Sequence, residues 1–205
     1  MDLSGEGFEG LKMVWVFPGG NTSHLAFSML PHSDKHEVKY IYLARNPKDL
    51  AVSFFHFSSM PFLNFEGTWE EFLQYFMQGK VPGGSYFDHV LEWWSHKDDE
   101  NVLFLKYEDL KKDLKGQIKM IADFLGLNFS DEQAGAVAEQ CTFQVMKSNS
   151  NTDLIQLVSK VFKKGSHLRK GIIGDWKNHF SKEQLEEFDK LYQSHVEGTG
   201  LQFDC

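Results

Sequence analysis

The segment Arg169-Lys170-Gly171-Ile172-Ile173-Gly174-Asp175-Trp176-Lys177-Asn178-His179-Phe180 determines how the rest of the chain is interpreted. Two adjacent cations precede a glycine, which lets the backbone come close to a ligand. A guanidinium gives charged, bidentate hydrogen bonds to phosphate oxygens, and backbone N–H groups nearby can add further donors. The segment therefore predicts an anion-binding loop. The alternative is that the arginine pairs with a neighbouring acid such as Asp175.

The chain places its second arginine in a similar setting. Of its 21 lysines and arginines, the two arginines are Arg45 and Arg169. Arg45 follows an apolar run typical of a buried strand, and Asn46 and Pro47 suit a helix N-cap and the first helical position. Open α/β sheets bind anions at this kind of strand-to-helix junction. The alternative for Arg45 is an ion pair with Asp49.

Composition narrows the class of protein. The formal net charge of −8 over 205 residues argues against nucleic acid as a partner. The N-terminal residues show no signal-peptide pattern, and no apolar run is long enough to span a bilayer. Cys141 and Cys205 form no disulfide framework. We expect a cytoplasmic protein without a membrane partner, and one domain over residues 1–205.

Apolar patterning predicts alternating strands and helices, and hence an α/β domain with a central parallel sheet flanked by helices. Aromatic side chains are dense in the second and third predicted helices, which indicates core packing or, alternatively, an apolar ligand pocket. Residues 147–168 are polar and weakly patterned, which predicts a loop. Strands are expected at 11–17, 38–43 and 101–106, and helices from 47 and at 68–78, 85–95, 114–125, 131–140 and 182–195. Capping boxes are expected at Thr68/Glu71, Ser130/Gln133 and Ser181/Gln184.

Several motifs in one order resemble the cytosolic sulfotransferase family. The principal ones are Tyr42-Leu43-Ala44-Arg45-Asn46-Pro47 with the residues up to Ser53, and the segment 169–180. Shorter matches are Gly67-Thr68-Trp69, Glu92-Trp93-Trp94, Tyr107-Glu108-Asp109-Leu110 and Thr142-Phe143. The resemblance extends from about residue 22 to the C-terminus and implies the P-loop-like sulfotransferase fold.

The resemblance also implies a reaction, namely transfer of a sulfuryl group from 3′-phosphoadenosine 5′-phosphosulfate (PAPS) to a hydroxyl or amine of a small, aromatic or apolar acceptor, without a metal. The residues that match the 3′-phosphate positions of the family are Arg45, Ser53, Arg169, Lys170 and Gly171. Those that match positions around the adenine are Tyr107, Thr142 and Phe143. His24, in Ser23-His24-Leu25-Ala26, matches the position of the family's catalytic base. A neutral imidazole at this position can take up the proton of the acceptor hydroxyl.

The chain departs from the family near its N-terminus. The family's Tyr-Pro-Lys-Ser-Gly-Thr-Thr-Trp loop has only a faint counterpart in residues 16–22, which contain no lysine, and Thr22 stands where the family has a second lysine. Loss of such a cation commonly costs about a hundredfold in rate. We therefore expect an N-terminally truncated member, and the alternative function is an inactive protein that keeps the 3′-phosphoadenosine half-site.

Two further motifs bear on partners and on other enzyme classes. Residues 177–186 follow the family's dimerisation pattern with Ser181-Lys182 at its centre, which predicts at most a weak homodimer. The chain contains no Gly-x-x-x-x-Gly-Lys motif, which disfavours a nucleotide kinase.

Overall fold

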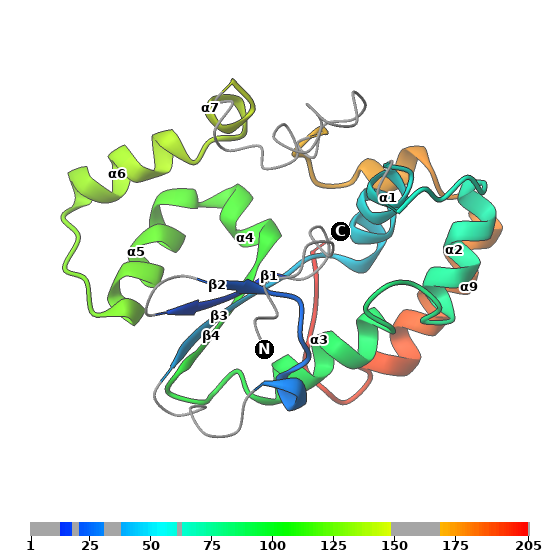
Figure 1. Ribbon diagram of the computed structural model, residues 1–205, viewed down its shortest axis with the longest axis horizontal. Helices are drawn as coiled ribbons and strands as arrows, with labels where there is room; N and C mark the ends of the chain where they lie inside the picture. Colours follow the sequence, from blue (N-terminus) through cyan, green and yellow to red (C-terminus); the bar gives the residue numbers. More distant parts are fainter. Residues whose placement is uncertain (1–12, 18–20, 31–37, 61–62, 149–168, 205) are drawn as a thin grey trace.

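A small sheet lies at the centre of the molecule, with helices to either side of it (Figure 1). The computed structural model describes residues 13–17, 21–30, 38–60, 63–148 and 169–204. In the view of Figure 1, α5 (Leu114–Leu125) and α6 (Asp131–Gln140) lie to the left of the sheet, and α2 (Trp69–Met77) and α9 (Lys182–Val196) lie to the right.

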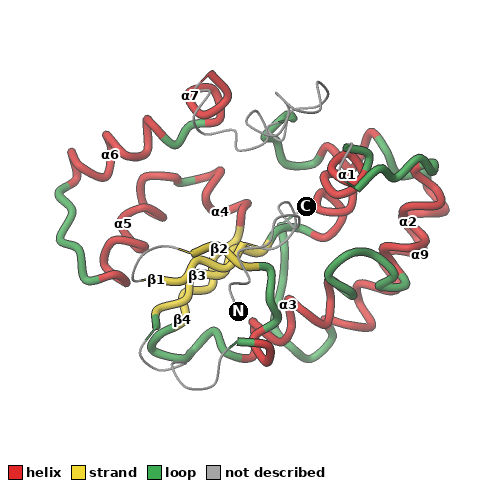
Figure 2. Tube along the Cα trace, viewed as in Figure 1, coloured by secondary structure: helices red, strands yellow, loops and turns green. Residues whose placement is uncertain are grey.

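The sheet has four strands in the order β2-β1-β3-β4, and Figure 2 shows them together in yellow. The strands are β1 (Met13–Phe17), β2 (Asn21–Ser23), β3 (Lys39–Ala44) and β4 (Val102–Lys106). The pair β3–β4 is parallel, as an α/β fold requires, whereas β1 is antiparallel to both of its neighbours. The prediction of an α/β sheet with parallel strands is confirmed, and the sheet as a whole is mixed. The β1–β2 connection is too short for the crossover that a parallel pair needs.

Strand β3 lies at the heart of the sheet because its sequence is apolar on both faces. Tyr40, Ile41, Tyr42 and Ala44 are all buried, which is typical of a strand covered on both sides. The strand begins and ends one residue later than the sequence predicts, so Arg45 follows it directly. This places the arginine at the corner between β3 and α1 (Pro47–Ser58).

The helix starts follow the capping residues that the sequence predicts. The Asn46 side chain accepts the Lys48 N–H, with Pro47 at the first helical position. All three predicted capping boxes are present, at the starts of α2, α6 and α9. The remaining helices are α3 (Tyr86–Ser95), α4 (Tyr107–Lys112) and α7 (Phe143–Ser148), with the 3₁₀ helices η1 (Phe27–Met29) and η3 (Asp175–Asn178).

Helices α4 and α7 were not predicted as separate helices. α4 follows β4 without a loop, and its N-cap residue Lys106 makes no side-chain cap, so the sequence carries no start signal there. α7 begins before the predicted loop 147–168 and includes only its first two residues, Lys147 and Ser148. Residues 149–168 of that loop lie outside the described residues.

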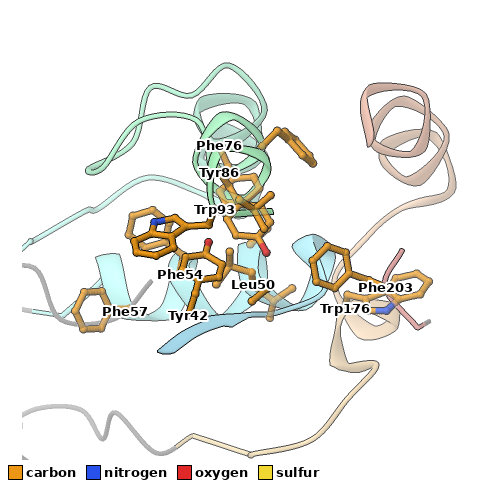
Figure 3. Packing of buried hydrophobic residues seen from close by; sticks show 14 of the residues in the cluster. Tyr42, Leu50, Phe54, Phe57, Phe76, Tyr86, Trp93, Trp176 and Phe203 are labelled. Atoms are coloured by element: carbon orange, nitrogen blue, oxygen red, sulfur yellow. The ribbon is translucent and has the colours of Figure 1, made fainter. Parts of the chain in front are cut away.

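Aromatic side chains from α1, α2 and α3 fill the core on one face of the sheet (Figure 3). Trp93 is fully buried and stacks on Tyr42, with ring centroids 5.1 Å apart. Phe54 and Phe76 are also buried. Most of the aromatic density of these helices therefore belongs to the core. Among the described residues, no helix is long and apolar enough to cross a membrane.

Candidate functional site

Three of the predicted site residues directly follow strands at the same edge of the sheet. Ser23 on β2 lies level with Tyr42 on β3 across the intervening β1. Because β1 is antiparallel to both, β2 runs in the same direction as β3 and β4. His24, Arg45 and Tyr107 each follow the last residue of a strand, so all three lie at the carboxyl edge, with β2 roughly 10 Å from β3.

Arg45 is held at this edge by contacts with three other segments. Its Nη2 donates to the Ile172 carbonyl oxygen at 3.1 Å, and its guanidinium lies 4.5 Å from the centre of the Tyr107 ring. The Tyr86 hydroxyl donates to the Arg45 carbonyl oxygen at 2.6 Å. Arg45 Nε is buried without a hydrogen-bond partner, and such an atom in a folded protein needs an explanation. Arg45 thus reaches the loop 169–174, 127 positions away in the sequence.

Asp49 fixes the backbone of that loop and does not form the ion pair considered above. Its carboxylate accepts the N–H of Gly174 at 2.6 Å and that of Trp176 at 3.0 Å, and the residue is 1% exposed. A carboxylate that accepts two backbone N–H bonds is well satisfied when buried. Helix α1 therefore holds the start of η3 in place.

Asp175 gathers the two cations of the loop. Arg169 Nη2 donates to it at 2.5 Å and Lys170 Nζ at 2.7 Å, which confirms the acidic partner considered for Arg169. Asn178 donates at 3.0 Å, and His179 Nε2 lies 3.6 Å away. Burial raises the pKa of the Asp175 carboxyl, but the hydrogen bonds from Lys170, Asn178 and Arg169 outweigh burial and hold its pKa well below the usual range.

The side chains of Arg169 and Lys170 remain partly exposed to solvent although both bind Asp175. The side chains of Arg169 and Lys170 are 27% and 46% exposed, whereas Asp175 is 1% exposed. The guanidinium and ammonium groups carry more N–H donors than Asp175 can accept. The arrangement can thus bind an anion with a positioned pair of cations.

Phe143 packs directly against Gly171. A Cβ on Gly171 would lie 2.2 Å from Cδ2 of the Phe143 ring, and the glycine has φ +64°, so no other residue fits here without strain. Thr142 organises the start of α7, since its Oγ1 donates to the Glu139 carbonyl oxygen at 2.9 Å and accepts the Val145 N–H at 3.4 Å. Of the residues predicted near an adenine, Phe143 therefore adjoins the predicted phosphate loop, and Thr142 directly precedes it at the start of α7.

Ser53 lies half-buried on α1. Within the described part of the chain, no hydrogen bond joins it to Arg169, Lys170 or Gly171. The residue one turn further, His56, stands within electrostatic range of the loop: burial, Arg169 and His179 lower its pKa. Sequence reasoning missed His56, although its spacing from Ser53 places both on one helix face.

His24 lies in a segment that is anchored to α3. The Ser23 Oγ accepts the Leu25 N–H at 3.1 Å, and Trp93 Nε1 donates to the Leu25 carbonyl oxygen at 3.2 Å. Three residues after His24, Phe27 stacks on His96 with ring centroids 3.6 Å apart. The predicted base is therefore positioned by α3, and the predicted phosphate residues by α1, η3 and α4.

A buried acid supports the corner at Arg45 and was also missed. Glu108 Oε1 accepts the Asn46 N–H at 2.8 Å, and burial raises the pKa of this carboxyl. No local sequence signal connects two residues that are 62 positions apart. Among the residues that the structure describes, no group of three or more His, Cys, Asp or Glu side chains could hold a metal ion.

Comparison with known proteins gives a consistent result. A family model described as "Sulfotransferase domain" matches residues 17–200. An amine sulfotransferase of Oryctolagus cuniculus is 43% identical over 187 residues, which cover 88% of this chain and 62% of the relative. Sulfotransferase 1B1 of Canis lupus familiaris is 44% identical over 185 residues, with the same coverage of 88% and 62%. The chain thus spans about three fifths of the length of these curated relatives.

Solved structures agree with the sequence relatives. The mouse sulfotransferase SULT7A1 complexed with PAP matches with a TM-score of 0.76 and 40% identity, over 86% of this chain and 64% of that one. A retinol dehydratase in complex with androsterone and the inactive cofactor PAP matches with a TM-score of 0.82 and 34% identity, over 87% and 53%. The match over residues 17–200, with identities above 40% to the curated relatives, shows that the chain belongs to the sulfotransferase family.

Proposed function

We propose that this chain binds PAPS and transfers its sulfuryl group to a hydroxyl or amine of a small, apolar or aromatic acceptor. The observation that carries the proposal is the bond from Arg45 to the Ile172 carbonyl oxygen, which brings the strand-to-helix corner and the loop 169–174 together. The complexes of related proteins with PAP support the same ligand class.

The proposed 3′-phosphate half-site consists of two cationic segments. Arg169 and Lys170 form one, and Gly171 lets the backbone approach the ligand. Arg45 forms the other, and its buried, unpartnered Nε is an additional donor beside the loop. Ser53 on α1 would complete the set through its hydroxyl.

The proposed adenine position lies between α4 and α7. Phe143 adjoins Gly171 and offers an aromatic ring for stacking. Tyr107 already has the Arg45 guanidinium over one ring face, so the edge of its ring is what it offers to a base. Thr142 acts by fixing the start of the helix that carries Phe143.

In the proposed reaction, His24 removes the proton from the acceptor hydroxyl. The acceptor oxygen forms a bond to sulfur while the bond from sulfur to the 5′-phosphate oxygen breaks, so the products are the sulfated acceptor and PAP. In-line transfers of this kind depend mainly on positioning and on stabilisation of charge on the leaving oxygens. The common sheet edge of His24 and Arg45 is consistent with a base on one side of the nucleotide and its anchor on the other.

A second candidate function is nucleotide binding without turnover. The observation that favours it is the composition of residues 16–22, which hold no lysine, with Thr22 at a position where the family has one. Without a cation beside the sulfuryl group, charge on the leaving oxygens would be poorly stabilised. The half-site around Arg169 does not depend on that cation.

A weak homodimer through residues 177–186, where Lys182 is exposed, also remains a prediction.

Calorimetric titration of the chain with PAP tests the shared part of both functions. We expect binding by the parent, loss of at least tenfold in affinity for Arg169→Ala because a charged bond to phosphate is removed, and no change for Lys190→Ala, an exposed lysine on α9. Equal affinities for the parent and Arg169→Ala would refute the half-site. Mass spectrometry of phenols, steroids and amines incubated with PAPS then separates the two functions, since a sulfated product requires the first.

A further inference from the structure

We propose that His56 is a further ligand of the 3′-phosphate held by Arg169 and Lys170, and that its imidazole takes up a proton from solvent when the phosphate binds. This inference rests on the proposed nucleotide site. It adds a residue that belongs to none of the matched motif positions, and it makes nucleotide affinity depend on pH.

The position of His56 on α1 is the first argument. It lies three residues after Ser53, and side chains at this spacing are neighbours on a helix surface. The edge-to-face contact of its ring with His179, at 5.5 Å between centroids, places it against η3. His179 Nε2 in turn lies 3.6 Å from the Asp175 carboxylate that holds Arg169. His56 therefore faces the cationic loop.

An unsatisfied nitrogen is the second argument. His56 Nε2 is buried without a hydrogen-bond partner, as is Nε of Arg45, whose guanidinium also contacts the loop. Leaving a buried polar group unpaired is costly, so folded proteins rarely retain one without a reason. A phosphate between Ser53 and Arg169 would give His56 Nε2 an acceptor oxygen after a small side-chain adjustment.

The charges around His56 are the third argument. Burial lowers its pKa, and so do the positive charges of Arg169, His179 and Lys170, while Asp175 acts in the opposite direction. These groups belong to the loop and to η3 with its C-cap residue His179. In the absence of anion the imidazole is accordingly neutral at pH 7.5. A phosphate dianion offsets the two loop cations and favours the imidazolium, so its pKa rises on binding.

The sign of the pH effect follows from this difference. A group whose pKa is higher in the complex takes up protons on binding. The affinity for a 3′-phosphorylated nucleotide should therefore increase as the pH falls from 8 toward the pKa of His56 in the free protein. The increase must be smaller for a nucleotide without a 3′-phosphate.

Calorimetry of the parent chain with PAP at pH 7.5, in two buffers of different ionisation enthalpy, measures the proton uptake directly. PAP's own phosphates contribute little at this pH, because the second pKa of a phosphate monoester is about 6. We expect a net uptake by the parent and none by His56→Gln. His96→Gln is the matched control, because His96 pairs with Asp99 at 2.8 Å and stacks on Phe27, away from the loop.

Affinities provide the second readout. His56→Gln should bind PAP roughly tenfold more weakly than the parent, the usual effect of losing a hydrogen bond to a charged group. Its affinity for adenosine 5′-phosphate should be unchanged. Equal proton uptake by the parent and His56→Gln, or no uptake by the parent, would overturn the inference and leave the nucleotide site intact. A parent chain that binds no PAP would overturn both. If His56→Gln does not fold, the absence of proton uptake by the parent would still overturn the inference.

Discussion

The two sides of the candidate site are built in different ways. On the anion side, two carboxylates that are each 1% exposed, Asp49 and Asp175, hold the loop through four short hydrogen bonds from its backbone N–H groups and cations. On the base side, His24 follows a three-residue edge strand, and one indole N–H from α3 fixes the next residue. The anion side is thus held by buried carboxylates and the cations of the loop, and the base side by hydrogen bonds to α3, from Trp93 and to Glu92, and by aromatic packing.

This difference has a consequence for function. A loop held by buried carboxylates is preorganised, so it should bind a phosphate whether or not chemistry follows. In the proposed reaction the base side contributes to turnover, and it lacks the lysine that the family carries at the position of Thr22. Substitutions on the two sides should therefore separate nucleotide binding from product formation.

The largest effect is expected from Asp49→Asn. The Gly174 N–H and the Trp176 N–H bond to different oxygens of the Asp49 carboxylate, so an amide in its place presents its NH₂ group to one of these two buried donors. We expect a loss of about 2–4 kcal/mol in the free energy of unfolding, measured by urea denaturation, together with loss of PAP binding. Asp98→Asn, whose side chain is 84% exposed, is the control and should leave both unchanged. Similar unfolding curves for the two variants would show that Asp49 does not hold the loop.

Thr22→Lys tests whether the base side limits turnover. A cation at this position would stabilise charge on the transferring group, and such groups are commonly worth about a hundredfold in rate. We expect product formation from PAPS to rise by about that factor while PAP affinity changes little. Thr22→Met, similar in length but uncharged, is the control. If both variants form no product, the binding function is favoured.

Substitution of two neighbouring tryptophans compares a hydrogen bond that anchors the base side with a similar hydrogen bond elsewhere in the molecule. Trp93→Phe removes the donor to the Leu25 carbonyl oxygen, and Trp94→Phe removes the donor to the Thr199 carbonyl oxygen at 2.9 Å. Each should lower stability by about 1–3 kcal/mol. Faster amide exchange in residues 21–30 and reduced product formation are expected for Trp93→Phe alone, with PAP affinity retained. Equal exchange in the two variants would refute the role of Trp93 as an anchor.

The features predicted best from the sequence are those that depend on residues close together in the chain, such as helix starts. The capping boxes at Thr68, Ser130 and Ser181 and the N-cap at Asn46 are local hydrogen-bond patterns, and the helices begin where these residues stand. The family motifs predicted that Arg45 and the loop from Arg169 belong to one site, and the structure brings them into contact through the Ile172 carbonyl oxygen.

Long-range roles could not be predicted in the same way. Asp49 was considered as an ion-pair partner, and its bonds to backbone N–H groups 125 and 127 residues away depend on how η3 packs against α1. Glu108 and Tyr86 act on the Arg45 corner from other elements, and no spacing rule connects them. The direction of β1 also depends on tertiary pairing, because an apolar run by itself does not specify a parallel or an antiparallel neighbour.

A pH titration of stability tests the charge that holds the anion side. The pKa of Asp175 is depressed in the folded state, so its contribution is complete above its unfolded pKa of about 3.9 and is lost as the pH falls toward the lower folded value. The difference in unfolding free energy between the parent and Asp175→Asn should therefore be constant from pH 7 to 5 and shrink from pH 4 to 3. Only part of the contribution is lost over this range, because the depressed pKa of the folded carboxyl moves the rest of the loss to lower pH. A difference that does not vary with pH would show that charge is not what Asp175 contributes.

The smallest effect is expected at Tyr107, where the anion side meets the proposed adenine position. The Arg45 guanidinium lies 4.5 Å from the centre of this ring, and a cation–π contact of this kind contributes about 0.5–1 kcal/mol at a partly exposed site. Tyr107→Leu should therefore weaken PAP binding by about three- to fivefold in calorimetry, because Arg45 loses the surface that orients it. Tyr107→Phe keeps the ring and should retain the parent's affinity. If Tyr107→Phe binds PAP as weakly as Tyr107→Leu does, the hydroxyl contacts the nucleotide directly. The orientation of Arg45 must then come from its hydrogen bond to the Ile172 carbonyl oxygen alone.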